Sequence, residues 1–246
     1  MTNYIILGIL QGVFEWLPVS SEGVVALASQ FLNINANPID FALFAHSGTL
    51  LAALIYFRKD WREVLTFKNK SLLKFLIIST TISLLIGFIM YNTVRSVAFG
   101  AGFLLLMGFG LLATAFFNKS KRKFNLNLTQ LALFSGLLQG FAVIPGLSRS
   151  GSTIFSLSLG GMKPSQILRI SYMMSVPVVL ASSVYVGLKD FSLALESWPT
   201  LVFSFIIGIA TLDFLIKISQ KINFFKFALI FGILCLFGAV LELVFV

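Results

Sequence analysis

Two short polar segments interrupt otherwise apolar stretches of this chain, and they hold the residue types that can do chemistry. In the first segment, Glu15 stands four residues after Gln11, on the same face of a helix, and shortly before the break at Pro18. A carboxylate within a transmembrane helix costs about 2.5–3.5 kcal/mol on insertion scales. A glutamate at position 15 therefore indicates a functional or structural role that offsets this cost. Glu22 follows the break, where it either caps free N–H groups or takes part in the chemistry.

The second segment holds the complementary charge. Arg149 lies between Ser148 and Ser150, at the predicted start of a short helix. A guanidinium beside the free N–H groups of a helix N-terminus is typical of phosphate sites. The alternative is that Arg149 only pairs with a glutamate of the first segment to close the packing. Hydroxyl groups for an anion site come from Ser20, Ser21, Ser148, Ser150, Ser152 and Thr153.

The remaining polar residues in apolar stretches are few. His46 is the only histidine, and it is either a hydrogen-bonded interior residue or part of the site. Asp213 and Lys217 are spaced as an i,i+4 ion pair. The sequence has no P-loop, dinucleotide fingerprint, zinc motif or Gly-x-Ser-x-Gly elbow, so we expect the chemistry at the two polar segments.

The composition places these segments in a membrane protein. Of 246 residues, 58% are hydrophobic and only 11% are charged, and the mean hydropathy is +0.97. Soluble domains carry about 25% charged residues, so an ordinary soluble domain is excluded. The net charge of +9 does not indicate nucleic-acid binding, because too little polar surface remains for it.

The hydrophobic pattern predicts an all-α integral membrane fold in one polytopic domain covering 1–246. Six transmembrane helices are predicted at 40–57, 74–93, 98–117, 165–188, 199–217 and 226–245. The stretches at 3–32 and 129–160 are each broken in the middle by Pro, Ser and Gly. Each therefore predicts a re-entrant helix–loop–helix hairpin.

The basic residues predict the orientation. Fifteen of the eighteen fall in segments on one side of the predicted topology, including a basic loop at 58–74. The positive-inside rule makes that side cytoplasmic and puts both termini outside. The first hairpin then enters from outside and the second from the cytoplasm, in a multi-pass protein of the cell membrane.

The two broken segments resemble each other. The sequences GILQG at 8–12 and SSEG at 20–23 match GLLQG at 136–140 and SRSG at 148–151, all at a shift of 128 residues. An odd number of crossings between them predicts inverted repeats, at about 1–117 and 129–246. Chance similarity between Gly- and Ser-rich apolar sequences is the alternative.

The sequences QGVFEWLPVSS at 11–21 and PGLSRSG at 145–151 resemble the two signature motifs of the undecaprenyl-diphosphate phosphatase family, the bacitracin-resistance type. The resemblance extends over nearly the whole chain, including the segment around His46. It implies a membrane hydrolase that removes the terminal phosphate of a polyprenyl diphosphate and so recycles the monophosphate carrier lipid for cell-envelope synthesis. It also implies inverted repeats, a pocket opening outward, and a divalent cation, usually Mg²⁺ or Ca²⁺.

The resemblance also implies roles for individual residues. Glu15, Ser21 and Arg149 are expected to be catalytic, as general base, nucleophile and phosphate-stabilising cation. Apart from the resemblance, the carboxylates themselves suggest an alternative role for Glu15, which with Glu22 could be an oxygen ligand of the cation. The expected substrate-binding residues are Gln11, Ser20, Ser148, Ser150, Thr153 and His46. The expected partners are the isoprenoid diphosphate and membrane lipids, with no nucleic acid and with homodimerisation left open.

The chain departs from the family pattern near the serines. Val24 stands where bacterial members usually have histidine, Glu22 replaces a small hydroxyl residue, and Gln11 is the less acidic of the family's two options. These departures indicate an archaeal-type or divergent member of the family. They also leave two candidates for the nucleophile, Ser21 and a water molecule activated by Glu15. The alternative functions are a flippase or transporter of the lipid carrier and a paralogue that binds polyprenyl phosphates without hydrolysing them.

Overall fold

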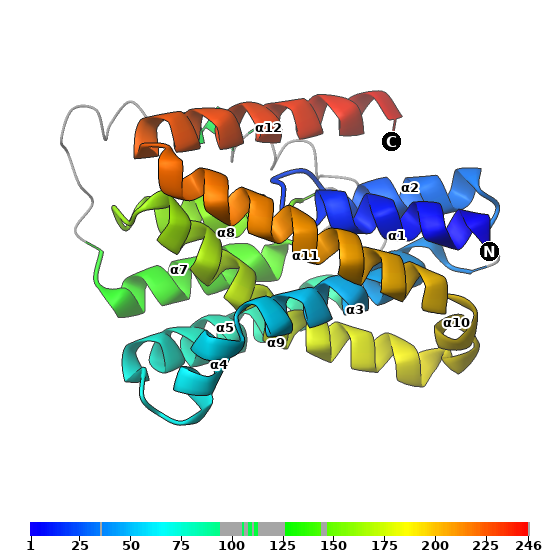
Figure 1. The fold of residues 1–246 in the computed structure, drawn as a ribbon, viewed down its shortest axis with the longest axis horizontal. Coiled ribbons are helices and arrows are strands. Elements are labelled where there is room, and N and C mark those ends of the chain that lie inside the picture. Colours follow the sequence, from blue (N-terminus) through cyan, green and yellow to red (C-terminus); the bar gives the residue numbers. More distant parts are fainter. Residues whose placement is uncertain are drawn as a thin grey trace.

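The protein is a bundle of helices in the computed structural model, which describes residues 1–34, 36–93, 105, 108–109, 111–112, 126–143 and 147–245 (Figure 1). Within these residues there is no β-strand. The helices are α1 (Thr2–Phe14), α2 (Ser21–Phe31), α3 (Pro38–Tyr56), α4 (Arg58–Leu65), α5 (Lys70–Thr93), α7 (Leu128–Phe141), α8 (Arg149–Ser158), α9 (Pro164–Lys189), α10 (Phe191–Glu196), α11 (Trp198–Lys221) and α12 (Phe224–Phe245).

Several of these helices suit a membrane, as the composition predicts. Three are long and apolar enough to cross one, namely α5, α9 and α11, and they coincide with the predicted spans at 74–93, 165–188 and 199–217. A fourth crossing is available if α3 and α4, bent by 76° to each other, form one span. The predicted span at 226–245 falls on α12, whose described apolar part is shorter. The one at 98–117 lies mostly outside the described residues.

Both broken stretches fold as helix, break and helix. Helix α1 ends at Phe14 and α2 begins at Ser21, while α7 ends at Phe141 and α8 begins at Arg149. The residue before each second helix is a serine N-cap. Ser20 Oγ accepts a hydrogen bond from the N–H of Gly23 (3.2 Å), and Ser148 Oγ accepts one from Gly151 (3.1 Å). A serine cap satisfies a free helical donor, so these local signals fix where each second helix starts.

The segment at 58–74, predicted as a basic loop, contains helix α4 instead. The sequence RKDWREVL puts Val64 and other apolar residues on one face, and Val64 is buried in the core. An ion pair between Asp60 and Arg169 joins α4 to α9. The loop prediction was wrong because a short amphipathic helix looks, by charge alone, like a solvated connection.

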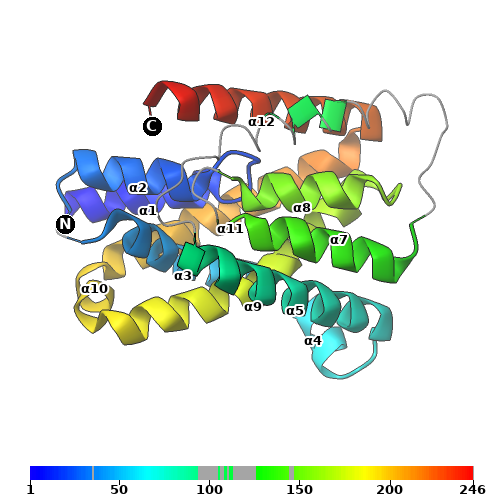
Figure 2. The same cartoon turned by 180° about the vertical axis from the view of Figure 1, so that it is seen from behind.

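The two hairpins enter the bundle from opposite ends, and their breaks meet in its middle (Figures 1 and 2). Both chain termini lie at the end from which α1 and α2 enter. Helix α4 and the turns between α8 and α9 and between α11 and α12 lie at the other end. The basic segments among the described residues, at 58–74, 163–169 and 217–226, therefore gather at the end opposite the termini.

Each hairpin packs against a long helix from the other half of the chain. Helix α1 packs against α11, and α7 packs against α5. Small residues allow the close approach: a Cβ on Gly12 would lie 2.7 Å from Ile207 Cβ, and one on Gly136 would lie 2.6 Å from the carbonyl oxygen of Ser79. In membranes, small residues at such contacts let helix backbones pack closely. The two halves are thus interlocked rather than separate domains.

We expect Gly136→Ala to destabilise the protein, because its methyl group would collide with the α5 backbone at Ser79. Overpacking of this kind costs about 1–3 kcal/mol, which corresponds to a drop of roughly 2–10 °C in Tm. Gly187→Ala in α9 is the matched control, because its Cβ would meet nothing within 4 Å. Thermal unfolding in detergent measures both variants. Equal Tm values for the two would contradict the close packing of α7 on α5.

Candidate active site

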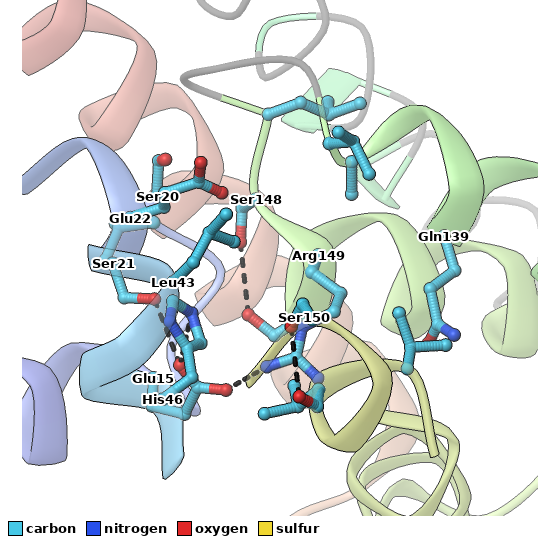
Figure 3. Close-up of a pocket in the computed structure, with 17 residues that line it drawn as sticks. Glu15, Ser20, Ser21, Glu22, Leu43, His46, Gln139, Ser148, Arg149 and Ser150 are labelled. Carbon is cyan, nitrogen blue, oxygen red and sulfur yellow. Dashed lines mark hydrogen bonds and ion pairs between the residues drawn. The ribbon is translucent and has the colours of Figure 1, made fainter. Parts of the chain in front are cut away.

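A pocket lies between the two hairpins and is lined by residues of both breaks, with about 620 Å³ of empty space that includes open solvent at its mouth. Its polar lining comes from both hairpins and from α3 and α9, and consists of Glu15, Ser20, Ser21, Glu22, His46, Gln139, Ser148, Arg149, Ser150 and Ser182. The N-terminal ends of α2 and α8 both reach this lining. Figure 3 shows the side chains around it.

The carboxylate of Glu15 is the centre of the polar contacts, and it is only 3% exposed. Its Oε2 accepts hydrogen bonds from Gln11 Nε2 (2.7 Å) and Ser21 Oγ (3.1 Å). His46 Nε2 lies 3.2 Å from the same oxygen. The guanidinium of Arg149 forms an ion pair with the other oxygen, Oε1. Five side chains from three separate stretches of the sequence, around residues 11–21, 46 and 149, thus form one cluster.

Arg149 is placed by its position as the first residue of α8. Its side chain is 17% exposed and reaches across the pocket from the second hairpin to Glu15 in the first. A second link runs beside it, because Ser150 Oγ donates to the carbonyl oxygen of Leu17. The two breaks are therefore joined by an ion pair and a hydrogen bond.

Two aromatic residues also hold the first break, between α1 and α2, in place. Trp16, 1% exposed, donates from Nε1 to the carbonyl oxygen of Gly208 in α11 (2.8 Å). Its own carbonyl oxygen accepts from the hydroxyl of Tyr172 in α9 (2.9 Å). The two rings pack together with centroids 4.9 Å apart. This anchor holds the peptide next to Glu15 against two long helices.

The structure divides the predicted substrate-binding residues into two groups. Ser20, Ser148, Ser150 and His46 line the pocket together with the predicted catalytic residues. Gln11 and Thr153 are fully buried behind it and do not line it. Gln11 supports Glu15, and Thr153 Oγ1 is hydrogen-bonded within α8 and to Ser171 of α9 (2.6 Å). Their contacts hold the site rather than face a ligand.

Two polar residues of the pocket were missed by sequence reasoning, Gln139 and Ser182. Gln139 is 2% exposed, and its Nε2 donates to Ser83 Oγ (3.0 Å) and to the carbonyl oxygen of Met174 (3.3 Å). Its place at the shift of 128 from Gln11 was a signal for it, whereas nothing in the sequence marked Ser182. In Figure 3, Gln139 and Glu15 lie on opposite sides of Arg149.

The side chains of the pocket could supply only some of the ligands that a divalent cation needs. No group of three or more His, Cys, Asp or Glu side chains that could hold a metal occurs among the described residues. Both oxygens of Glu15 are engaged by protein donors, so Glu22, which lines the pocket, is the carboxylate available. Mg²⁺ is usually held by one or two carboxylates together with substrate phosphates, and Glu22 satisfies the protein's share of that arrangement.

The arrangement suits an anion with several oxygens. One guanidinium and two helix N-termini converge on the pocket, and each favours phosphate. Beside them, a serine hydroxyl donates to a buried carboxylate, which is the geometry of a nucleophile and its base. The site can thus bind a phosphate group and activate a hydroxyl or water next to it.

Comparisons with known proteins agree with this chemistry. The family model described as bacitracin resistance protein BacA matches residues 4–239. A protein of Methanococcoides burtonii named undecaprenyl-diphosphatase is 33% identical, with 95% of this chain and 96% of the relative covered. Proteins of the same name from Haloarcula marismortui and Thermosipho africanus are 34% and 33% identical, covering 96% and 92% of this chain and 96% and 94% of their own lengths. The chain therefore belongs to the BacA family of bacitracin resistance proteins.

Proposed function

We propose that this protein is a membrane phosphohydrolase that removes the terminal phosphate from a polyprenyl diphosphate of the undecaprenyl type. The observation that carries the proposal is the buried cluster in which Ser21 and Arg149 contact the two oxygens of Glu15 in a pocket between two helix N-termini. The relatives' name, undecaprenyl-diphosphatase, identifies the substrate class. The products are the lipid monophosphate and inorganic phosphate.

Substrate binding requires Arg149 to change partner. In the structure the guanidinium is paired with Glu15. A diphosphate in the pocket brings oxygens of higher charge, and a guanidinium binds such oxygens in a planar, two-pronged manner. Arg149 then holds the phosphate group, together with free N–H groups at the start of α2 and α8. It also stabilises the charge that spreads over the phosphate oxygens during transfer.

The release of Arg149 leaves Glu15 free to act as a base. Ser21 Oγ, already donating to Glu15 Oε2, bonds to the terminal phosphorus while the bond from phosphorus to the bridging oxygen breaks. The electron pair of that bond leaves with the lipid monophosphate, and the Ser21 proton passes to Glu15 and then to the departing group. Water next attacks the phosphoserine, and its proton returns through Glu15 to Ser21 Oγ as inorganic phosphate leaves.

Glu22 and the phosphate oxygens of the substrate would hold the divalent cation, Mg²⁺ or Ca²⁺. A bound cation supplies further neutralisation of the diphosphate charge. Ser20 and Ser148 cap the half-helices, so their oxygens keep the N-terminal donors of both helices in place.

For the membrane arrangement we propose six crossings and two re-entrant hairpins in inverted repeats. Each hairpin packs on a long helix of the other half of the chain, α1 on α11 and α7 on α5. This reciprocal packing supports inverted repeats. The gathering of basic segments opposite the termini supports cytoplasmic loops and external termini. The pocket then opens outward, and the prenyl chain lies against apolar helix faces in the lipid.

We expect Glu15→Gln and Arg149→Ala each to lower phosphate release from a polyprenyl diphosphate by at least about 10²-fold in detergent-purified protein. The first loses the base and the second loses the cation on the transferring group. Asp213→Asn is the control, since it makes the same change in an ion pair with Lys217 outside the pocket, and it should retain activity. If folded wild-type protein binds the lipid but releases no phosphate, the proposal of an enzyme is wrong, and a carrier or a binding protein is favoured instead.

Replacement of Ser21 distinguishes the two nucleophiles. If Ser21 attacks phosphorus, Ser21→Ala abolishes turnover, and wild-type protein quenched during turnover carries the labelled terminal phosphate. If water attacks, Ser21→Ala loses one hydrogen bond to Glu15, worth about 1 kcal/mol, or roughly fivefold in rate. Ser47→Ala is the matched control, because Ser47 bonds to Ser183 of α9 and does not line the pocket. A Ser21→Ala rate within tenfold of wild type would exclude the serine.

The orientation can be tested with single cysteines. Cys235 is buried, so the native chain should react little with a membrane-impermeant maleimide. In intact cells we expect Thr2→Cys to be labelled from outside and Lys68→Cys to be labelled only after the membrane is opened. The reverse pattern would place the termini in the cytoplasm.

A further inference from the structure

The pocket wall contains a buried amide oxygen that has no hydrogen-bond partner. In the described part of the chain, four buried side-chain atoms lack a partner, namely Gln11 Oε1, Trp61 Nε1, Gln139 Oε1 and Ser197 Oγ. Of these four residues, only Gln139 lines the pocket. Leaving a buried acceptor unpaired is costly, so each such atom needs an explanation. A donor that reaches Gln139 in another state of the site would be one.

The neighbours of Gln139 fix which end of its amide remains for the pocket. Ser83 Oγ donates to the carbonyl oxygen of Gly136 (3.0 Å), so it can only accept from the amide (3.0 Å). The carbonyl oxygen of Met174 in α9 can also only accept (3.3 Å). These two acceptors use both hydrogens of Nε2, so the nitrogen and the oxygen cannot exchange places. The free atom is therefore an acceptor, Oε1.

The substrate has no donor for this oxygen. An ionised diphosphate offers only acceptors, and a prenyl chain offers neither donors nor acceptors. The guanidinium of Arg149 has five N–H donors, and among the described residues its only side-chain partner is Glu15. Figure 3 shows Gln139 and Glu15 on opposite sides of Arg149. Arg149 is thus the donor-rich group of the pocket that lies between the two.

The need for this acceptor arises when Arg149 turns to the phosphate. A two-pronged contact with phosphate uses two of the five N–H donors, and the others still need acceptors in a partly buried pocket. Ser182 on α9 already donates to the carbonyl oxygen of Val179 (3.0 Å). The remaining lining residues from α9 and from just after α7 are apolar, namely Ala142, Val143, Val178 and Val179.

We propose that Gln139 is a positioning residue for Arg149, whose guanidinium donates to the amide oxygen of Gln139 once it has turned from Glu15 to the phosphate. At the shift of 128, Gln11 supports Glu15 in the first hairpin by donating from Nε2 (2.7 Å). Glutamine thus holds the carboxylate in one hairpin and the guanidinium in the other. The part in catalysis rests on the phosphatase proposed above, whereas the part in binding a diphosphate does not.

Binding of a diphosphate that cannot be hydrolysed tests the proposal without turnover. The probe is farnesyl methylenediphosphonate, titrated calorimetrically into detergent-purified protein. We expect Gln139→Leu to weaken binding about tenfold, because a donor of the bound guanidinium loses its acceptor. In an Arg149→Lys background, the same change should weaken binding less than about twofold, since one ammonium nitrogen cannot span the phosphate and Gln139.

Three results of this titration would overturn the proposal: no binding by folded wild type, unchanged binding in Gln139→Leu, or equal losses in both backgrounds. Binding with the expected coupling, but without hydrolysis of a polyprenyl diphosphate, would reject the enzyme and keep the positioning role. The two proposals can therefore fail separately.

A loss of packing alone gives a different result. Ser135→Ala is the matched control, because Ser135 lies one turn before Gln139 in α7, is fully buried, and accepts from Ser156 (2.8 Å) without lining the pocket. We expect it to bind the probe as wild type does, even if its Tm falls. In the phosphatase assay, Gln139→Leu should raise KM about tenfold and change kcat less than about threefold, since Arg149 holds the phosphate in both states. A fall in kcat alone, or the same loss of binding in Ser135→Ala, would contradict the role of Gln139.

Discussion

The site depends on one constraint, a carboxylate that is buried in a membrane domain and must be satisfied by protein donors. The side chains that contact Glu15 come from α1, α2, α3 and α8, so the cluster forms only when both hairpins and the first long helix have come together. Removing one partner from such a buried charge costs about 3–5 kcal/mol. The contacts of Glu15 with Ser21 and Arg149 therefore also specify how the surrounding helices pack.

The depth at which these donors meet follows from backbone packing. Two hairpins can end in the middle of the bundle only if their polar turns are covered by protein, since lipid cannot satisfy them. Close approach at Gly12 and Gly136 brings each hairpin against a long helix of the other half. Tyr172 then donates to the carbonyl oxygen of Trp16 in the first turn, and the indole of Trp16 donates to Gly208 of α11. The free N–H groups of α2 and α8 remain for the pocket, which is where an anion needs them.

Sequence reasoning succeeded where the signal is local. Pro18 and the serine caps mark the breaks, and long apolar runs mark α5, α9 and α11. It could not decide which glutamate faces Arg149, because these residues are 134 positions apart and packing alone sets their distance. The same holds for His46, whose apolar surroundings are equally typical of an interior residue. Helix α4 was missed because charge hid its amphipathic pattern, and 98–117 lies mostly outside the described residues.

The two breaks share a scaffold but carry different side chains. At the shift of 128, Ser21 corresponds to Arg149, and both are the first residues of a half-helix after a serine cap. Glu15 corresponds to Val143, which also lines the pocket but is apolar. A symmetric pair of carboxylates would repel each other, and a symmetric pair of arginines would leave no base. Placing the hydroxyl and carboxylate on one hairpin and the guanidinium on the other gives a pocket that can hold an anion and activate a nucleophile at once.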